Sequence, residues 1–224
     1  MSPAPLCLIS AVQATMMLIA ARAMVASLTL DFALDQHHQA ECNITAGQVC
    51  ITGHSRNGKQ SLIAAAYDER ITAVVGSSPG APISSPYSFS SHNYYGEGPD
   101  AGQAGHWWLS SIVNYTAHPE RLPCDGHCVL ALIAPRHAAV ADGWTDHEGC
   151  DTFADEMAIA AAQPVYQLLG AESNIQNIHR PGDHHGFIDV ASYFDYFDWA
   201  FKRQAGPVFP LAWTGQNWCR KEMP

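Results

Sequence analysis

The sequence has few charged residues and no run of positive charge. Only 14% of its 224 residues are charged, and 11 Lys and Arg against 21 Asp and Glu give a formal net charge of −10. Nucleic acids and anionic membranes select basic protein surfaces, so this charge balance argues against both as partners. The hydrophobic content of 47% is typical of a folded globular chain rather than a disordered one.

The chain also has no unbroken apolar run of membrane-spanning length. The apolar stretch at 5–30 is interrupted by Gln13 and Arg22, and no positively charged segment precedes it. Because a transmembrane helix needs about 20 consecutive apolar residues, a membrane span is not expected. Helical spacing over 11–34 favours a buried or amphipathic helix of the fold, and a signal peptide ending near 20–23 is the alternative.

The seven cysteines form no C-x-x-C pair and no zinc-ligand spacing. Cys50 lies in an apolar run and is predicted to be a buried thiol. A disulfide joining Cys124 and Cys128, or either of them to Cys150, is an open alternative. These cysteines and two N-glycosylation sequons favour a secreted or extracytoplasmic protein.

No internal repeat or low-complexity linker divides the chain, so 1–224 is predicted to form one domain. Short apolar runs alternate with helical patterns, which indicates an α/β fold with a parallel sheet and flanking helices. Residues 77–128 are rich in Ser, Gly, Pro and aromatics and are predicted to be a long loop or lid. The expected strands are 48–52, 71–76, 137–141 and 174–178; the expected helices are 57–68, 152–169 and 187–203; 129–134 fits either.

The segment 49–59 has the pattern of a strand, a tight turn and a helix, with Ser55 at the turn. Such a turn exposes the serine and places helix N–H groups behind it, as in the G-x-S-x-G nucleophile elbow. Here Asn57 stands at the second glycine position, and its tolerance of left-handed backbone makes the departure mild. The alternative is that Ser55 simply caps the helix.

An acid and a base follow Ser55 in the order expected for its partners. Asp146 lies just beyond the third predicted strand, with Asp142 and Glu148 as alternatives. The loop before the last helix contains His184 and His185, and either could be the base. The order Ser, Asp, His is that of the α/β-hydrolases.

Asp183 precedes the two adjacent histidines and raises the question of a metal site. Metal ligands must converge on the ion, and the sequence offers no evident third ligand. The sequence therefore predicts neither a metal nor a cofactor.

The elbow Gly53-His54-Ser55-Arg56-Asn57-Gly58-Lys59 resembles that of the glucuronoyl esterases and their bacterial acetyl-xylan-esterase-like relatives. The resemblance covers about residues 45–203 and implies an α/β-hydrolase fold and hydrolysis of a carbohydrate ester. Further similar segments are 106–108, 122–127, 131–136, 164–170 and 182–187.

The resemblance implies roles for individual residues. Ser55 would be the nucleophile, and Arg56 would hold the oxyanion through its backbone N–H and side chain. The sugar site would be lined by Lys59, Trp144, Glu97 and Trp107, since aromatic faces and charged groups suit a sugar. The plainer alternatives are a solvated helix charge for Lys59, loop packing for Trp144 and simple exposure for Glu97.

The sequence departs from that family in two places. Many glucuronoyl esterases have an acidic residue just after the strand that follows the elbow, but 76–80 contains no carboxylate, which favours Asp146 as the acid. Family members also have several strands before the elbow, whereas this chain has room for one helix, so we expect the N-terminal strands of the sheet to be missing.

These observations predict a serine-dependent hydrolase of carbohydrate esters, a glucuronoyl ester or acetylated xylan being the substrate. The alternative is an inactive, truncated hydrolase fragment or a carbohydrate-binding relic. A peptidase of the same fold is less favoured, because nothing in the sequence indicates a domain that filters substrates.

Overall fold

The structure is a computed structural model that describes residues 17–86, 111, 114–115, 118–146, 152–185 and 190–202. No helix in these ranges has the length and apolar character needed to cross a membrane. The longer elements are α2 (Met17–Ala33), α3 (Gln39–Cys42), β1 (Cys50–His54), α4 (Arg56–Tyr67), β2 (Ala73–Ser77), α5 (Gly126–Ile133), β3 (His137–Gly143), α6 (Thr152–Leu168), β4 (Ile175–Arg180) and α7 (Val190–Ala200).

The four strands form one parallel sheet in the order β1-β2-β3-β4. This confirms the predicted α/β class with a parallel sheet and flanking helices. In register, Gly53 of β1 lies opposite Gly76 of β2, and Gly76 lies opposite Val140 of β3. Because all four strands run in the same direction, their carboxyl ends meet at one edge, where ligands bind in open α/β sheets.

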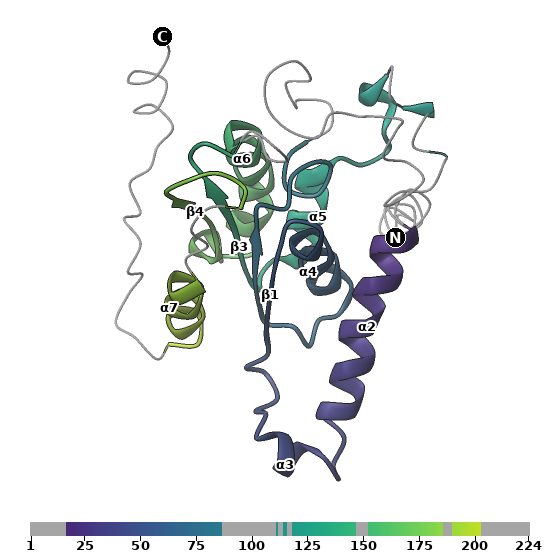
Figure 1. The fold of residues 1–224 in the computed structure, drawn as a ribbon, viewed down its shortest axis with the longest axis vertical. Helices are drawn as coiled ribbons and strands as arrows, with labels where there is room; N and C mark the ends of the chain where they lie inside the picture. Colours follow the sequence, from purple (N-terminus) through teal and green to yellow (C-terminus); the bar gives the residue numbers. More distant parts are fainter. Residues whose placement is uncertain are drawn as a thin grey trace.

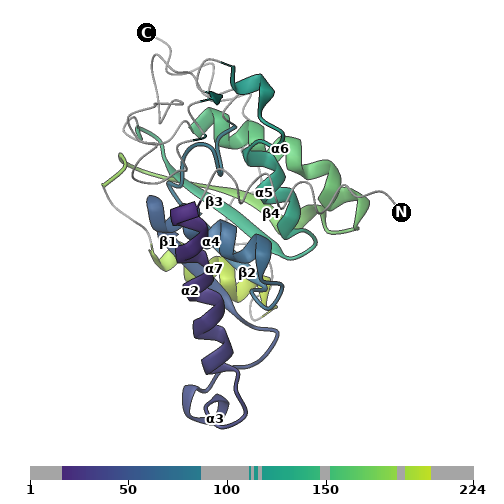
Figure 2. The same ribbon diagram turned by 90° about the vertical axis from the view of Figure 1, so that its right-hand side faces the viewer.

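The sheet is covered on both faces, and alternate residues of each strand serve the two sides. Val74 and Val140 pack into a cluster with buried residues of α2, α4, α5 and α6. Val75 and Ala139 belong to a second cluster that includes Phe197 of α7. Figures 1 and 2 show α7 on the side of the sheet opposite α4, with α2 lying along the outside of α4.

The first strand differs from its prediction. Val49 is buried, but β1 begins at Cys50, which is exposed rather than a buried thiol. The predicted burial of Cys50 is therefore wrong: β1 pairs with β2 alone among the described residues, and Cys50 and Thr52 of this edge strand are both exposed. No strand precedes Cys50 in the described part of the chain, whereas 1–16 lie outside it.

Most other elements lie within a few residues of their predicted positions. The ambiguous segment 129–134 belongs to a helix, α5, which starts at Gly126 behind the N-cap Asp125. Cys124 and Cys128 are free thiols, so the disulfide between them is not formed, and Cys150 is outside the described residues. The lid predicted at 77–128 falls largely on residues that are not described and stays a prediction.

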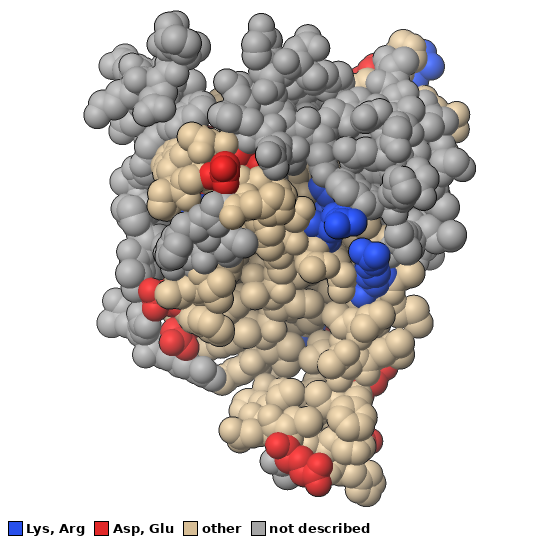
Figure 3. Space-filling view, viewed as in Figure 1, with Lys and Arg blue, Asp and Glu red and all other residues tan. Residues whose placement is uncertain are grey.

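The charged residues of the described surface are sparse. On the face in Figure 3, Lys and Arg form small separated groups, and Asp and Glu lie apart from them. This distribution agrees with the low charged fraction of 14%.

One charged network joins α2 to the sheet layer. The Arg70 guanidinium donates to Asp31 of α2 at 2.7 Å and to the Ser27 carbonyl at 3.1 Å. It also makes a two-point contact with the Asp68 carboxylate at 2.9 and 2.7 Å. This hydrogen bonding holds the pKa of Asp68 down at about 2.

Arg70→Met is expected to lower the free energy of unfolding at pH 7 by about 1–2 kcal/mol, a low figure because Arg70 is partly exposed. A carboxyl whose pKa is lowered on folding stabilises above its unfolded pKa of about 3.9, and this contribution disappears as the pH falls further. The difference between the variant and the wild type should therefore shrink from pH 4 towards about 2. Denaturant unfolding at several pH values measures it; an equal effect from the exposed control Arg121→Met would contradict this account.

Candidate active site

Ser55 occupies a sharp turn between β1 and α4. Its φ of 56° is in the left-handed region, which is unusual for a residue with a side chain. The turn is held because the Ser55 N–H donates to the carbonyl of Ser77 at 2.8 Å. A Cβ on Gly53 would lie 2.4 Å from the Asn57 carbonyl oxygen, and one on Gly58 would lie 2.8 Å from that of Ser77. Both glycines therefore permit a close main-chain approach.

Two sequence-based interpretations of this turn are corrected by the structure. The tolerance of Asn57 for left-handed backbone is not what makes its departure from the elbow pattern mild, because the positive φ is at Ser55 and Asn57 lies in the first turn of α4. Ser55 does occupy the N-cap position of α4, yet its side chain makes no capping hydrogen bond. The hydroxyl is directed elsewhere.

The carboxyl ends of β1, β3 and β4 bring three polar side chains together. Nε2 of His184 lies 3.0 Å from Oγ of Ser55. Nδ1 of the same ring lies 2.9 and 3.2 Å from the two carboxylate oxygens of Asp146. A carboxylate only accepts hydrogen bonds, so it favours the tautomer with the proton on Nδ1, and this leaves Nε2 as an acceptor for the serine hydroxyl.

The structure distinguishes the candidates for the base and for the acid wherever these residues are described. His185 is exposed and makes neither of the two contacts that His184 makes. Asp142 is fully buried within β3, beside Asp155 and not beside His184. Glu148 lies outside the described residues.

Asp142 and Asp155 form a buried pair of carboxyl groups next to the site. Burial first, and then the charge of Asp155, raises the pKa of Asp142 well above its usual range. The raised pKa favours the protonated form of Asp142, and hydrogen bonding with Asp155 adds to this shift. Asp155 also accepts a short hydrogen bond from Ser85.

Arg180, at the end of β4, is a site residue that sequence reasoning missed. Its side chain is only 1% exposed. The guanidinium donates to the carbonyl oxygens of Asp183 at 2.7 Å and His184 at 3.2 Å, and to Oγ of Ser78 at 2.8 Å. One side chain thus fixes the histidine loop to the end of β2, and a lone Arg just after the predicted strand 174–178 gave no signal of this.

His54 is a second residue that was missed, although it stands in the elbow itself. Its Nδ1 lies 3.1 Å from Oγ of Ser77, which also accepts a hydrogen bond from Tyr193. Burial lowers the pKa of His54 to about 4, and the charges of His184, Arg180 and His185 add to this. His54 is therefore neutral above about pH 5.

The residues predicted to hold the oxyanion or to bind sugar lie in different structural environments. Arg56 is the first residue of α4, so its N–H lies at the helix N-terminus beside Ser55. Lys59 is buried and donates to the Pro79 carbonyl, so its interpretation as a solvated charge is wrong. Trp144 stacks on His179 with ring centroids 4.3 Å apart, which supports loop packing. Sugar contacts of these residues stay predictions; Glu97 and Trp107 are outside the described residues.

Comparison with known proteins identifies the family of this chain. A family described as "Glucuronyl esterase, fungi" matches residues 11–170. The chain belongs to the glucuronoyl esterase family. Its relatives include carbohydrate esterase MZ0003 of an unknown prokaryotic organism, 30% identical over 158 residues that make up 68% of this chain and 33% of the relative. The 4-O-methyl-glucuronoyl methylesterase of Phanerochaete carnosa is 25% identical over 67% of this chain and 36% of its own.

Solved glucuronoyl esterase structures share the fold. The enzyme from Caldicellulosiruptor kristjansonii, of carbohydrate esterase family 15, matches with a TM-score of 0.64 and 28% identity over 73% of this chain and 45% of its own. A promiscuous esterase of that family from a marine bacterial metagenome gives a TM-score of 0.70 and 26% identity over 83% and 48%. The chain spans about a third of the curated relatives and about half of these solved chains.

Asp142→Asn is expected to change how stability depends on pH. A carboxyl whose pKa is raised on folding holds a proton that the unfolded chain releases above about pH 4, so its contribution to stability falls as the pH rises from there. The neutral amide lacks this titration and can still donate to Asp155. The unfolding free energy of the variant should therefore decline less between pH 4 and 8 in denaturant titrations. Parallel curves for both proteins would show that Asp142 is ionised in the folded state.

Proposed function

We propose that this chain is a serine carboxylic-ester hydrolase acting on carbohydrate esters. The observation that carries the proposal is the contact of one imidazole, that of His184, with both Ser55 and Asp146. The distances of 3.0 and 2.9 Å are within the range needed for proton transfer and for orientation of the ring. His185 and Asp142 then have no part in proton transfer.

The first step forms an acyl-enzyme. Oγ of Ser55 attacks the ester carbonyl carbon while its proton passes to Nε2 of His184. Asp146 accepts the Nδ1 proton as a hydrogen bond and stabilises the imidazolium without being protonated itself. The imidazolium then protonates the leaving alkoxide. In the second step the imidazole deprotonates water, which attacks the acyl carbon and releases the acid and the Ser55 hydroxyl.

The negative charge that develops on the carbonyl oxygen needs donors close to Ser55. The Arg56 N–H, first in α4, supplies one, and the dipole of the helix favours an anion at this end. One such donor is worth roughly 2.7–4 kcal/mol of transition-state stabilisation. Ser55 occupies the end of this helix without using its hydroxyl to cap it, which leaves both groups available to the substrate.

The preferred substrate is an ester of a glucuronic acid, with acetylated xylan as the alternative. Relatives named as 4-O-methyl-glucuronoyl methylesterases support the uronate ester. In that ester the sugar supplies the acyl group, whereas in acetylated xylan it supplies the alcohol. Initial rates on methyl glucuronate, benzyl glucuronate and an acetylated xylo-oligosaccharide separate the two; release of acetate alone would overturn the uronate assignment.

The purified 224-residue chain is expected to react covalently with a fluorophosphonate probe at Ser55, because the probe reports a serine that a base has activated. Ser55→Ala should lose both the labelling and the hydrolysis of an aryl ester. Intact-protein and peptide mass spectrometry locate the adduct. A wild-type chain that unfolds cooperatively but is not labelled would contradict the proposal and favour a carbohydrate-binding role without turnover.

Asp146→Asn is expected to lower kcat by about 10³–10⁴-fold, because an amide does not enforce the Nδ1–H tautomer. Asp142→Asn is the matched control, since the same change is made in the same segment to a buried carboxyl whose pKa is raised. Its kcat should stay within about threefold of the wild type. If the two variants lost activity equally, Asp146 would not be the orienting acid.

A further inference from the structure

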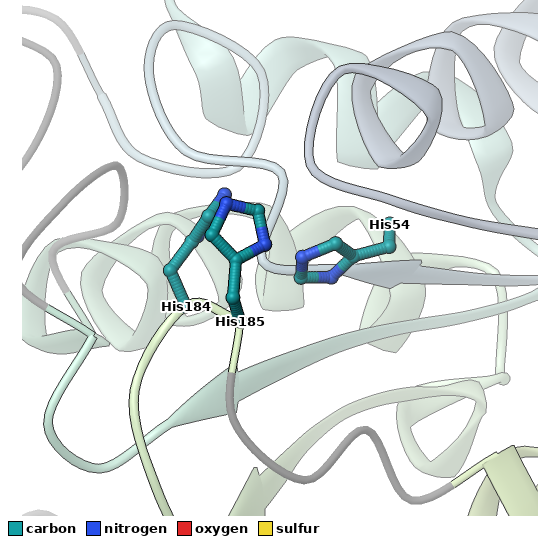
Figure 4. A group of neighbouring side chains, drawn as sticks. All are labelled: His54, His184 and His185. Carbon is teal, nitrogen blue, oxygen red and sulfur yellow. The ribbon is translucent and has the colours of Figure 1, made fainter.

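A cluster of three imidazoles surrounds the point where Ser55 meets its base. His54 ends β1, and His184 and His185 follow β4, so the three come from distant segments of the sequence. Figure 4 shows the His54 ring directed towards the other two rings. The ring centroid of His54 lies 4.8 Å from that of His184 and 5.7 Å from that of His185.

Each of these rings offers a nitrogen to the space between them. One potential ligand atom from each histidine lies within 4.8 Å of the other two. Nδ1 of His184 is held by Asp146 and Nδ1 of His54 by Ser77, so these two rings would bind a ligand through Nε2, which in His184 is the atom that contacts Oγ of Ser55. Nε2 of His54 is buried and has no hydrogen-bond partner among the described residues. A buried polar atom without a partner is costly unless something binds it.

We propose that His54, His184 and His185 bind a zinc ion, and that the bound ion switches off Ser55. Imidazole nitrogen suits zinc and copper, whereas magnesium and calcium prefer oxygen ligands. Three histidines and one water complete a tetrahedral zinc site. The sequence alone did not suggest this site, because the third ligand stands far from the adjacent pair.

The geometry requires a modest closure of the cluster. Nitrogens bound to zinc at about 2.0–2.1 Å lie roughly 3.3 Å from one another in a tetrahedron. The separations of up to 4.8 Å must therefore shorten by about an ångström. We assign most of this shortening to His185, whose side chain is exposed, because His54 and His184 are held by their Nδ1 contacts.

The inhibition follows from the lone pair that the ion occupies. Nε2 of His184 is the atom that accepts the Ser55 proton, and coordination to zinc takes up the same lone pair. The serine then keeps its proton, and no covalent bond forms or breaks. The inhibitory part rests on the proposed esterase function, whereas the binding part does not.

Zinc binding is tested by calorimetry on the full chain carrying no polyhistidine tag. The expected result is that His54→Asn and His185→Asn each weaken zinc binding by at least about tenfold. The matched control His37→Asn, which removes an exposed histidine outside the cluster, should leave it unchanged. The double variant Cys124→Ser/Cys128→Ser should also keep the binding, which excludes these two thiols as its source.

Inhibition is measured separately, by ester turnover and by fluorophosphonate labelling of Ser55 at rising zinc concentration. Zinc should suppress both in the wild type, EDTA should restore them, and the inhibitory concentration should rise at least about tenfold in His185→Asn. Each variant is compared with its own zinc-free rate. Magnesium should have no effect.

The possible results test the zinc site, the inhibition and the proposed esterase function separately. Equal zinc affinity in the wild type and in His185→Asn, whose exposed ring makes a folding defect unexpected, would overturn the site. Zinc bound at the cluster without loss of labelling would overturn the inhibition. If Ser55 proved unreactive in the absence of zinc, the proposed function would fall, and calorimetry would still decide whether the three histidines bind the ion.

Discussion

The main-chain contact at the end of β1 is the constraint on which the site depends. The chain leaves the strand, reverses at Ser55 and enters α4 so closely that a methyl group at Gly53 would overlap the Asn57 carbonyl. The Ser77 carbonyl of the neighbouring strand accepts a hydrogen bond from the Ser55 N–H and fixes the position of the turn relative to β2. The serine can hold its left-handed backbone because both neighbours, strand and helix, determine its position.

The parallel sheet converts this local constraint into a site. Since β1, β3 and β4 run in one direction, the segments that follow them lie at the same edge of the sheet. Ser55, Asp146 and His184 belong to these segments and are in contact there. This is why the order of a serine, an acid and a histidine in the sequence predicted a contact among them, while the choice between His184 and His185 and among the three acidic residues stayed open. The strands β2 and β3 could also be predicted from the sequence, because strands buried on both faces contain mostly apolar residues.

Features that depend on the neighbours of an element could not be predicted from the sequence in the same way. The run ending at Thr52 indicates a buried strand, but β1 is the edge strand of the described sheet, and its residues Cys50 and Thr52 are exposed. Asp142 and Asp146 are both acidic residues near the end of β3, and only the three-dimensional structure shows that Asp146 contacts His184 whereas Asp142 is buried near Asp155 with a raised pKa. His54 and Arg180 acquire their surroundings from segments that are remote in the sequence, so no local pattern marked them.

The hydrogen bonds of Arg180 bear on how this scaffold tolerates change. Two of the groups that it holds are main-chain carbonyls, at Asp183 and His184, and a carbonyl is present whatever side chain a residue carries. The loop is therefore anchored independently of its own side chains at 183 and 185. Evolution can exchange the exposed residues there, and with them the groups that meet a substrate, while the imidazole of His184 stays where it is. In this sense the anchor separates the part of the loop that must stay constant from the part that is available for new specificities.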